Sequence, residues 1–463
     1  MHSKFSLFSK EFLGKRCWGI TLTQISTDAE VSSEESARVS NSDSSSPNVS
    51  ESFSKPSMFS SLKIRNFRLL LGAQIISNIG IWMQRIAQDW LVLTLTDHSP
   101  VALGIASALQ FAPFLLFSLW AGAVADRVDK RRLVLVTQTL ICLQSLVLGL
   151  LVVTGSVQLW QVFLFCLIFG FLDVFESPAR SALLVEIVGK EKVASATALN
   201  SSTSTMAALV GPAIAGYAIA GFGIGWLFLI DAMSTSAVVV GLMLMNPSKL
   251  FRAAIASENK KQIRAGLFYI SKNLNLIAVM ILILVVGSLA IHFAISLGIA
   301  AVKVFHVGAA EYGLMASFLA VGSFVGVFVA ARLGARKAPE MTRLLLSIFI
   351  FGLGELVVAF MPTYLAFCIV LVPVSCIGTV LLTTALSFVQ IVTLPEMLGR
   401  VMAFYFLMLV GGNTLTSPIL GWLASVFGGR SLFIVGGVAS ICAAGICAIT
   451  LSRKRKVEIA VGT

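Results

Sequence analysis

Two opposite charges, Arg85 and Asp89, lie inside a long apolar segment of the sequence. Residues four positions apart share one helix face, so these two side chains can pair directly. Gln74 and Asn78 extend the same face into a polar stripe. Because a charge inside a membrane helix is costly and usually faces a cavity or pathway, Asp89 is a candidate site for a proton or a cation. Arg85 is a candidate for binding an anion or tuning Asp89. The alternatives are a structural ion pair and an Asp89 close to a membrane surface.

Three further titratable residues stand in apolar segments. His292 has Ser288 four positions before it and Ser296 four positions after it. Histidine titrates near physiological pH, so His292 is a candidate proton carrier, with a hydrogen-bonded packing role as the alternative. Asp231 and Glu355 are isolated acids and candidates for proton coupling.

A charged loop separates the second long apolar segment from the third. Its three consecutive basic residues and two carboxylates cannot lie in hydrocarbon, so we expect the loop at a membrane surface. Its pattern predicts a gate: Gly122 permits close helix approach, and Asp126 can meet a helix N-terminus of another part of the protein. A basic loop that only fixes topology is the alternative. The gate candidates in this loop are Gly122, Asp126, Arg127, Lys130, Arg131 and Arg132.

A second charged group, Asp173, Glu176 and Arg180, follows the fourth apolar segment. Glu176 and Arg180 have the spacing of a helical ion pair. We expect this group near the same surface as the loop, where a carboxylate can form a charge relay with Arg127 or Arg131. These three residues are added to the gate, and a solvated helix end is the alternative.

The fifth apolar segment contains Gly211, Pro212 and Gly216. Proline removes a helix hydrogen bond, and glycine allows close packing of neighbouring helices. These residues predict a helix bend with a close contact on one face. A kink that serves packing alone is the alternative.

The composition excludes an ordinary soluble protein. The chain has 463 residues, of which 57% are hydrophobic and 12% charged, with a mean hydropathy of +0.92. Soluble domains carry about 25% charged residues. We expect about twelve membrane-spanning helices, each close to the roughly 20 residues that cross a bilayer. The expected spans are 69–95, 101–124, 133–154, 159–177, 193–220, 224–245, 276–301, 313–333, 343–361, 364–390, 402–426 and 430–451.

The basic residues predict the orientation. Of the 34 Lys and Arg, Lys303 and Arg430 fall on one side, Arg85 falls within a span, and all others share the side of the N-terminus. Positive loops stay in the cytoplasm, so both termini are expected there. The net charge of +12 therefore marks the cytoplasmic membrane surface, and no nucleic-acid partner is expected.

The sequence repeats weakly at an offset of about 207 positions, which predicts two six-helix halves around a central cavity. The matching pairs are Asn66 with Asn273, Gly80 with Gly287, Arg85 with His292, and Pro212 with Pro418. Met58 is an alternative start of translation, because the preceding Ser-rich stretch cannot form a core. The expected divisions are a disordered tail 1–65, halves 66–246 and 273–452, a cytoplasmic linker 247–272 and a basic tail 453–463.

Several chemistries have no signature in this sequence. There is no Gly-x-x-x-x-Gly-Lys-[Ser/Thr] loop for ATP and no His-Glu-x-x-His or Gly-x-Ser-x-Gly motif. Four histidines are scattered, and the seven cysteines form no Cys-x-x-Cys pattern. We therefore expect no enzyme activity, no cofactor and no metal site.

The loop from Gly122, Gly-x-x-x-Asp-Arg-x-x-basic-basic, resembles the signature of the major facilitator superfamily. The segments 82–92, 177–180, 198–200 and 399–402 resemble its enterobactin-exporter-like branch, also called drug:proton antiporter family 3. The Gly-Pro-x-x-x-Gly run from Gly211 resembles part of an antiporter motif. The resemblance implies a fold of twelve helices in two six-helix halves, and proton-driven export of siderophores, macrolides or other amphiphiles. It also implies that the charged loop stabilises the outward-facing state.

The sequence departs from this family at two places. Asp129 stands where the loop consensus has glycine. The arginine that many drug:proton antiporters carry in the fourth span is missing from residues 164–175, so coupling through that residue is not carried over.

These patterns together predict an all-α secondary transporter in a bacterial cytoplasmic membrane. Its expected partners are a small amphiphilic substrate, protons and the lipid bilayer, and a monomer is expected. An uptake permease or a lysolipid flippase on the same fold is the alternative for function. A membrane sensor that signals through the Ser-rich tail is a further alternative.

Overall fold

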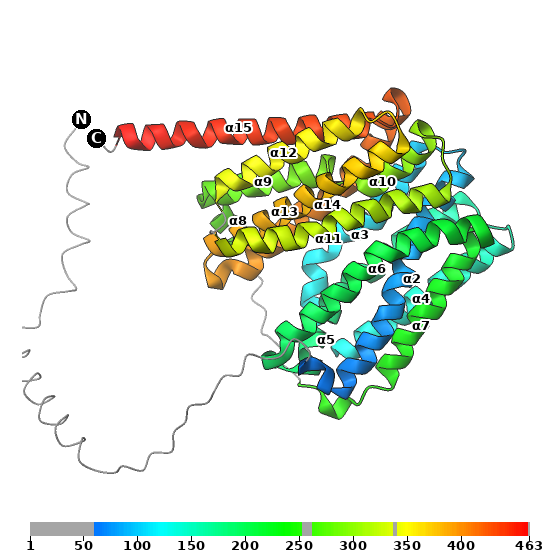
Figure 1. Cartoon of the computed structure of the whole chain (residues 1–463). Coiled ribbons are helices and arrows are strands. Elements are labelled where there is room, and N and C mark those ends of the chain that lie inside the picture. The colour runs from blue at the N-terminus through cyan, green and yellow to red at the C-terminus, as the bar shows by residue number, and fades with distance from the viewer. Residues whose placement is uncertain (1–59, 252–261, 337–339, 462–463) are drawn as a thin grey trace, which may run out of the picture. The chain divides into compact units, whose positions relative to one another are not determined.

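Helices make up all regular structure in the ranges that the computed structural model describes, 60–251, 262–336 and 340–461 (Figure 1). Residues 1–59, and with them most of the predicted tail and Met58, lie outside the described residues. The first six long helices are α2 (Arg65–Leu95), α3 (Pro100–Arg127), α4 (Lys130–Val153), α5 (Leu159–Val188), α6 (Val193–Phe222) and α7 (Ile224–Met243).

The second part of the chain repeats this arrangement with one interruption. Its helices are α8 (Gln262–Lys272), α9 (Leu274–Leu289), α10 (Phe293–Ile299), α11 (Ala309–Arg336), α12 (Met341–Ala359), α13 (Tyr364–Val392), α14 (Leu398–Phe427) and α15 (Ser431–Val461). Short turns of other helix types are η1 (Ser60–Lys63), η2 (Lys190–Lys192), η3 (Pro247–Lys249), η4 (Ala300–Val304) and η5 (Pro395–Met397).

Eleven stretches of the described chain are long and apolar enough to cross a membrane. They correspond to all of the predicted spans except the first. The first span is α2, whose 31 residues give a length of about 46 Å at 1.5 Å per residue. That length exceeds the roughly 30 Å of hydrocarbon, and the polar stripe explains the lower hydropathy of α2.

Local sequence explains where several helices begin. Ser99 accepts a hydrogen bond from the Ala102 amide at the start of α3, and Pro100 occupies the first position of that helix, where its missing N–H is not needed. Asp129 caps α4 by accepting from the Arg132 amide, and Thr363 caps α13 in the same way. Side-chain oxygens at these positions satisfy amides that the helix leaves unpaired.

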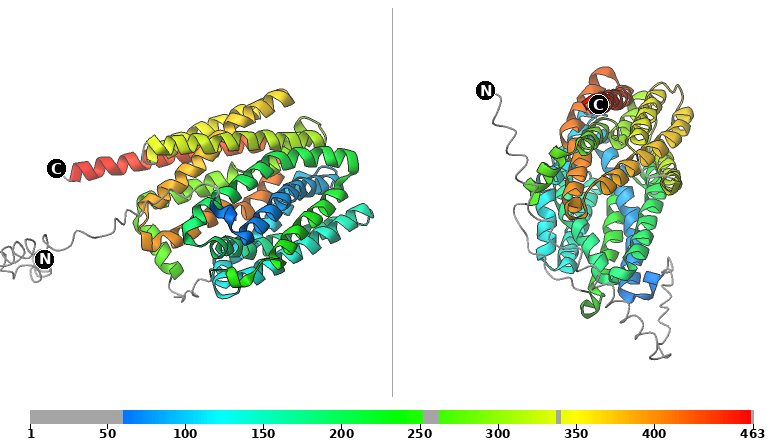
Figure 2. Two further views of the ribbon diagram at one scale, coloured as in Figure 1. Left: turned by 60° about the horizontal axis from the view of Figure 1, so that its bottom comes forward. Right: turned by 90° about the vertical axis from the view of Figure 1, so that its left-hand side faces the viewer.

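Two groups of helices form the bundle, the N-terminal half (α2–α7) and the C-terminal half (α9–α15). In the N-terminal half α2 packs against α6 and α7, and α4 packs against α5 and α7. In the C-terminal half α11 packs against α13, α12 against α13 and α15, and α9 against α14. Figure 2 shows the helices of both halves running along one common direction.

The most extensive contacts between the halves are those of α3 with α14 and of α6 with α11. Glycines bring the backbones together: a Cβ on Gly104 would collide with the Ser417 carbonyl, and one on Gly421 with the Pro100 carbonyl. Small residues at a helix crossing allow this close approach in a bilayer. All these residues lie toward the end of the bundle where α2 joins α3, which we call the far end.

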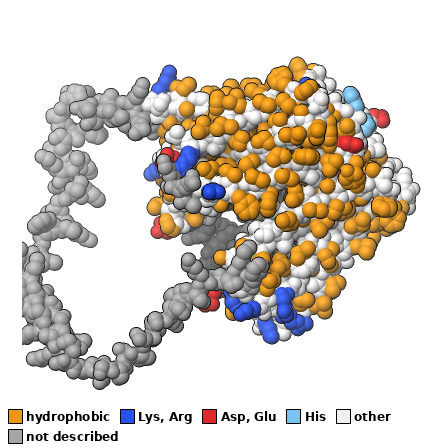
Figure 3. Space-filling view, viewed as in Figure 1, with side chains coloured by type: hydrophobic (Ala, Val, Ile, Leu, Met, Phe, Trp, Pro, Cys, Tyr) orange, Lys and Arg blue, Asp and Glu red, His pale blue; other side chains and the backbone are white. Residues whose placement is uncertain are grey.

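Basic side chains gather at the opposite end, where α3 joins α4, α5 joins α6 and α13 joins α14. We call it the basic end. In Figure 3 the Lys and Arg side chains lie toward one end of the helices, and hydrophobic side chains cover the band beside them. A continuous apolar band between polar ends is the surface expected of a protein embedded in lipid.

Five segments differ from the predicted boundaries. Residues 60–65, assigned to the disordered tail, are folded: Ser61 is buried and its hydroxyl lies 3.0 Å from that of Ser195. The linker includes the helix α8. Helix α15 continues through the predicted basic tail to Val461, and α5 continues past Pro178 to Val188. The predicted seventh span is broken between Leu289 and Phe293.

Candidate functional site

Two adjoining cavities lie among the helices. The polar cleft, about 440 Å³, is lined by α2, α4, α5 and α6 of the N-terminal half. The central pocket, about 400 Å³, is lined by α2 and α6 on one side and by α10, α11 and α13 on the other. Trp82, Arg85 and Ser204 line both cavities, so the two adjoin at these residues.

The polar cleft extends toward the basic end. Its wall includes Leu184 and Val185, near the last turn of α5, and Leu70 and Gln74, near the start of α2. The paired backbones of α3 with α14 and α6 with α11 lie toward the far end. The polar cleft and the central pocket, together called the cavity, therefore lie between the basic end and the contacts of the two halves toward the far end.

Asp89 forms a contact between the two halves. The Tyr312 hydroxyl, on α11, donates to Asp89 Oδ2 over 2.9 Å, and both residues line the central pocket. Trp90 stacks on the Tyr312 ring, with 6.0 Å between centroids. Hydrogen bonds to a charged acceptor are stronger than those between neutral groups, so this bond joins α2 to α11 when Asp89 is ionised.

Arg85 does not form the predicted ion pair with Asp89. Its guanidinium lies over the Trp82 ring, 5.2 Å from the centroid. The ion pairs within 4.0 Å found in the described part of the chain are Lys130 with Glu186 and Arg180 with Glu176. Arg85 is instead exposed to the cavity. The predicted stripe is otherwise present, because Gln74, Asn78 and Arg85 all line the polar cleft.

His292 lies at the break between α9 and α10, and the continuous helix predicted around it is wrong. It is the N-cap residue of α10 and is buried. Its Nε2 is 3.1 Å from the Thr416 hydroxyl, which itself donates to the Gly412 carbonyl. This geometry links the helix break to α14.

The two isolated acids are buried away from the cavity. Asp231 is 0% exposed, and its Oδ2 accepts from Ser145 Oγ over 2.7 Å. Glu355 is 1% exposed and lies against Gly436, close to the Leu289 carbonyl at the helix break. Asp231 Oδ1 and Glu355 Oε2 have no hydrogen-bond partner among the described residues. Neither acid lines the polar cleft or the central pocket.

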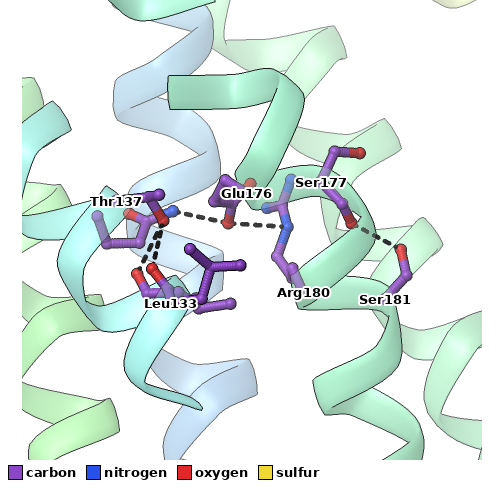
Figure 4. A network of polar contacts seen from close by, with 8 residues as sticks. Leu133, Thr137, Glu176, Ser177, Arg180 and Ser181 are labelled. Atoms are coloured by element: carbon purple, nitrogen blue, oxygen red, sulfur yellow. Dashed lines mark hydrogen bonds and ion pairs between the residues drawn. The ribbon is translucent and has the colours of Figure 1, made fainter. Parts of the chain in front are cut away.

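Glu176 and Arg180 form the predicted pair, but not at a helix end. Arg180 Nε lies 3.2 Å from Glu176 Oε1, and Gln138 Nε2 donates to the same oxygen over 3.0 Å (Figure 4). Glu176 is 2% exposed. Because α5 continues to Val188, the pair spans Pro178 within the helix. The solvated end is therefore wrong, and Glu176 is held by Arg180 and Gln138.

The basic residues of the predicted gate contact the N-terminal half. Lys130 Nζ is 3.2 Å from Glu186 Oε1 on α5. Arg131 donates to the Leu242 carbonyl through Nε at 2.9 Å and Nη2 at 2.7 Å. The Leu242 carbonyl lies in the last turn of α7, where the helix dipole favours a cation. Arg131 therefore ties α4 to α7, and its relay with Glu176 stays a prediction.

The remaining gate candidates have separate outcomes. A Cβ on Gly122 would meet nothing within 4 Å, so the predicted close helix approach is wrong. Arg127 ends α3, and both Arg127 and Arg132 are exposed. The side chain of Asp126 lies outside the described residues. Asp173 lines the polar cleft.

The proline segment of α6 lies at helix contacts. A Cβ on Gly211 would collide with Trp82 on α2, and one on Gly216 with the Ala309 carbonyl of α11. The Pro212 carbonyl faces Gly313 of α11 in the same contact. The predicted close packing is therefore present, and it joins the two halves.

Sequence reasoning missed Tyr312 and Trp82 as site residues. Tyr312 stands one position before the predicted eighth span, where it was treated as part of a loop. The chain has only five tyrosines, and one placed next to an intramembrane segment is a usable signal for a polar contact. Trp82 lies three positions before Arg85, which places both on one helix face.

Comparisons with known proteins agree with this architecture. Residues 56–460 match the family described as transmembrane secretion effector. The chain is 26% identical to the staphyloferrin A transporter of Staphylococcus aureus, covering 79% of this chain and 91% of that protein. It is 22% identical to macrolide efflux protein A of Streptococcus pyogenes, covering 82% and 95%. It is 21% identical to the enterobactin exporter of Citrobacter koseri, covering 78% and 85%.

Solved transporter structures share the fold. A bacterial homologue of the human lysosomal transporter Spinster, in an inward-facing and unoccupied conformation, has a TM-score of 0.63 and 14% identity, covering 83% of this chain and 95% of that one. The nucleoside transporter NupG has a TM-score of 0.66 and 12% identity, covering 83% and 99%. With the family match over nearly the whole described chain, these findings show that the protein belongs to the transmembrane secretion effector family, the efflux-type multi-pass transporters of the major facilitator superfamily.

Proposed function

We propose that this protein exports a small amphiphilic compound across a bacterial cytoplasmic membrane in exchange for protons, by alternating access. The hydrogen bond between Asp89 and Tyr312 is the observation that carries the proposal. It joins the two halves at the wall of the cavity, and one of its partners can bind a proton.

The cavity supports alternating access. It adjoins the contacts of α3 with α14 and of α6 with α11, and it extends toward the basic end. Rocking of the halves about a central site would close the basic end and open the far end. The glycine contacts are suited to such a rearrangement, since small residues leave few side chains to disengage.

The basic residues support the direction. Positive loops remain in the cytoplasm, so the basic end faces the cytoplasm and the termini lie on that side. The cavity then receives its substrate from the cytoplasm or the inner leaflet. The names of the relatives include a macrolide efflux protein and an enterobactin exporter, and these names support export as the direction of transport.

Asp89 supports proton coupling. As a carboxylate it accepts a charge-assisted hydrogen bond from Tyr312, and this bond stabilises the approach of α2 to α11. A proton on Asp89 removes the negative charge and weakens that bond. Protonation would therefore lower the free energy of separating the halves at this point, so the protonation state of Asp89 is linked to the conformation of the halves.

A transport assay with a reversible gradient tests this proposal. The purified protein is reconstituted in liposomes, and its orientation is determined from the accessibility of the basic end to an external protease. Uptake of a labelled siderophore, a macrolide and a cationic dye is measured with the pH gradient imposed in either direction. Export predicts that substrate accumulates on the side opposite the basic end only when protons move toward the basic end. Accumulation in the same direction as the protons would favour the uptake permease.

A further inference from the structure

We propose that Arg85 binds a carboxylate, or another oxyanion of similar geometry, of an amphiphilic substrate whose apolar part occupies the central pocket. This proposal adds a chemical class of substrate to the export function proposed above, and it rests on that function. It concerns which chemical class the cavity accepts, which neither the family nor the named relatives assign to this residue.

Arg85 has no carboxylate partner within 4.0 Å in the described part of the chain, although it lies within the apolar bundle. Its guanidinium is instead held over Trp82. The guanidinium N–H groups have no hydrogen-bond partner among the described residues, and their fork matches two oxygens of a carboxylate. A bound anion would give Arg85 the direct ion pair that it lacks within 4.0 Å in the described chain, and pairing of this kind stabilises a charge inside a membrane.

Arg85 lies where the polar head group of an amphiphilic ligand would meet its apolar tail. It lines both the polar cleft and the central pocket. On the side of the C-terminal half the central pocket presents apolar side chains, including Phe293, Leu297 and Leu319. On the side of the cleft, Asn78 and Asn200 supply amides. A ligand with its tail against α10 and α11 therefore places its head group at Arg85.

The acids of the cavity are less suited to bind a cationic head group. Asp89 already accepts from Tyr312, beneath the stacked Trp90 ring. Glu176 is paired with Arg180. Asp173 lines the polar cleft but not the central pocket, so a head group at Asp173 would draw the apolar part away from α10 and α11. Arg85 is the basic residue in the described lining of the central pocket.

A matched ligand series tests this inference by binding alone. Dansylated undecanoic acid, its methyl ester and its quaternary ammonium analogue share one apolar chain and differ in head-group charge. Energy transfer from tryptophan to dansyl reports their affinity for the purified full-length protein in detergent. We expect the acid to bind about tenfold more tightly than the ester, the effect of one charge-assisted hydrogen-bonded contact. Equal affinities, or tightest binding of the ammonium compound, would overturn the proposal.

Variants assign the effect to Arg85. Arg85→Gln is expected to bring the acid to the affinity of the ester while the ester itself binds as before, which also shows that the pocket is intact. If Arg85→Gln weakens both ligands, Arg85→Lys decides: it must retain a preference for the acid, and equal affinities would refute the proposal. Arg430→Gln is the control, because Arg430 donates to the Met361 carbonyl at the far end.

The ligand-binding series and the liposome assay together separate this inference from the proposed function. Preference for the acid without any exchange of protons in liposomes would leave the Arg85 site standing and reject proton-coupled export. Exchange of protons for cationic or neutral compounds, with no preference for the acid, would leave export standing and reject the anion site.

Discussion

The Asp89 carboxylate on α2 and the Tyr312 hydroxyl on α11 are 2.9 Å apart, and the hydrogen bond between them joins the two halves of the protein. The residues are separated by 223 positions in the chain. Trp90, beside Asp89, stacks on the Tyr312 ring, so two consecutive residues of α2 supply the polar and the aromatic contact. A proton at Asp89 thus acts where the halves meet.

Replacement of Tyr312 by phenylalanine should weaken this link. The ring and its stacking on Trp90 are retained, while Asp89 loses its donor. A hydrogen bond to a charged group contributes about 1.5–3 kcal/mol, so we expect the initial rate of proton-driven transport in liposomes to fall about tenfold. Tyr217→Phe is the matched control, since Tyr217 is exposed on α6. Equal rates for Tyr312→Phe and the wild type would remove the hydrogen bond from the mechanism.

Gly313→Ala should open the contact between α6 and α11. The new Cβ would collide with the Pro212 carbonyl, and backbone atoms cannot move aside as a side chain can. We expect a larger population with the far end open. The readout is thiol labelling of Ser107→Cys, a position whose hydroxyl lies 3.3 Å from that of Ser417 on α14, in a protein whose native cysteines are replaced by serine.

Gly221→Ala controls for the methyl group itself, because a Cβ at Gly221 on α6 would meet nothing within 4 Å. Labelling should rise in Gly313→Ala and stay at the reference level in Gly221→Ala. Unchanged labelling in Gly313→Ala would show that the α6 and α11 contact does not hold the far end closed.

The sequence predicted the helices and their grouping well, because the bilayer sets both the length of the apolar segments and the placement of the basic loops. The charge at 127–132 and the gaps between apolar windows gave nearly all helix boundaries. The end of α5 was missed, because the predicted fourth span ended at residue 177 and α5 ends at Val188. The helix continues through Pro178, with Arg180 paired to Glu176 across the proline.

Side-chain partners were harder to predict because they depend on helices distant in the chain. The spacing of Arg85 and Asp89 satisfied the rule for a helical ion pair, yet Trp82 and Tyr312 are the partners found. The break at residues 290–292 has no proline or glycine to mark it. Its neighbours are Glu355 and Gly436, which come from α12 and α15.

Loss of Arg180 should destabilise the protein more than loss of the whole pair. In Arg180→Gln the Glu176 carboxylate stays buried with Gln138 as its remaining donor. Removing one partner of a buried pair leaves an uncompensated charge. Because Arg180 is partly exposed, with a side chain at 32%, we expect a loss of about 1–3 kcal/mol. The measurement is the thermal unfolding midpoint in detergent.

The double variant Glu176→Gln with Arg180→Gln should recover much of that midpoint, since no buried charge remains. Ser181→Ala is the control, because the Ser181 hydroxyl donates only to the Ser177 carbonyl one turn away. A double variant less stable than Arg180→Gln would mean that the Glu176 charge itself is needed by other groups of the fold.

Substrate-triggered proton movement tests the central claim most directly. Inverted membrane vesicles carrying the protein are energised, and dissipation of the pH gradient is followed on addition of each candidate compound. The proteins compared are the wild type, Asp89→Asn and Glu355→Gln. Glu355→Gln is the control, because Glu355 is buried away from the cavity. Proton coupling at Asp89 predicts compound-dependent dissipation in the wild type and in Glu355→Gln, and none in Asp89→Asn. Equal dissipation in the wild type and Asp89→Asn would contradict it.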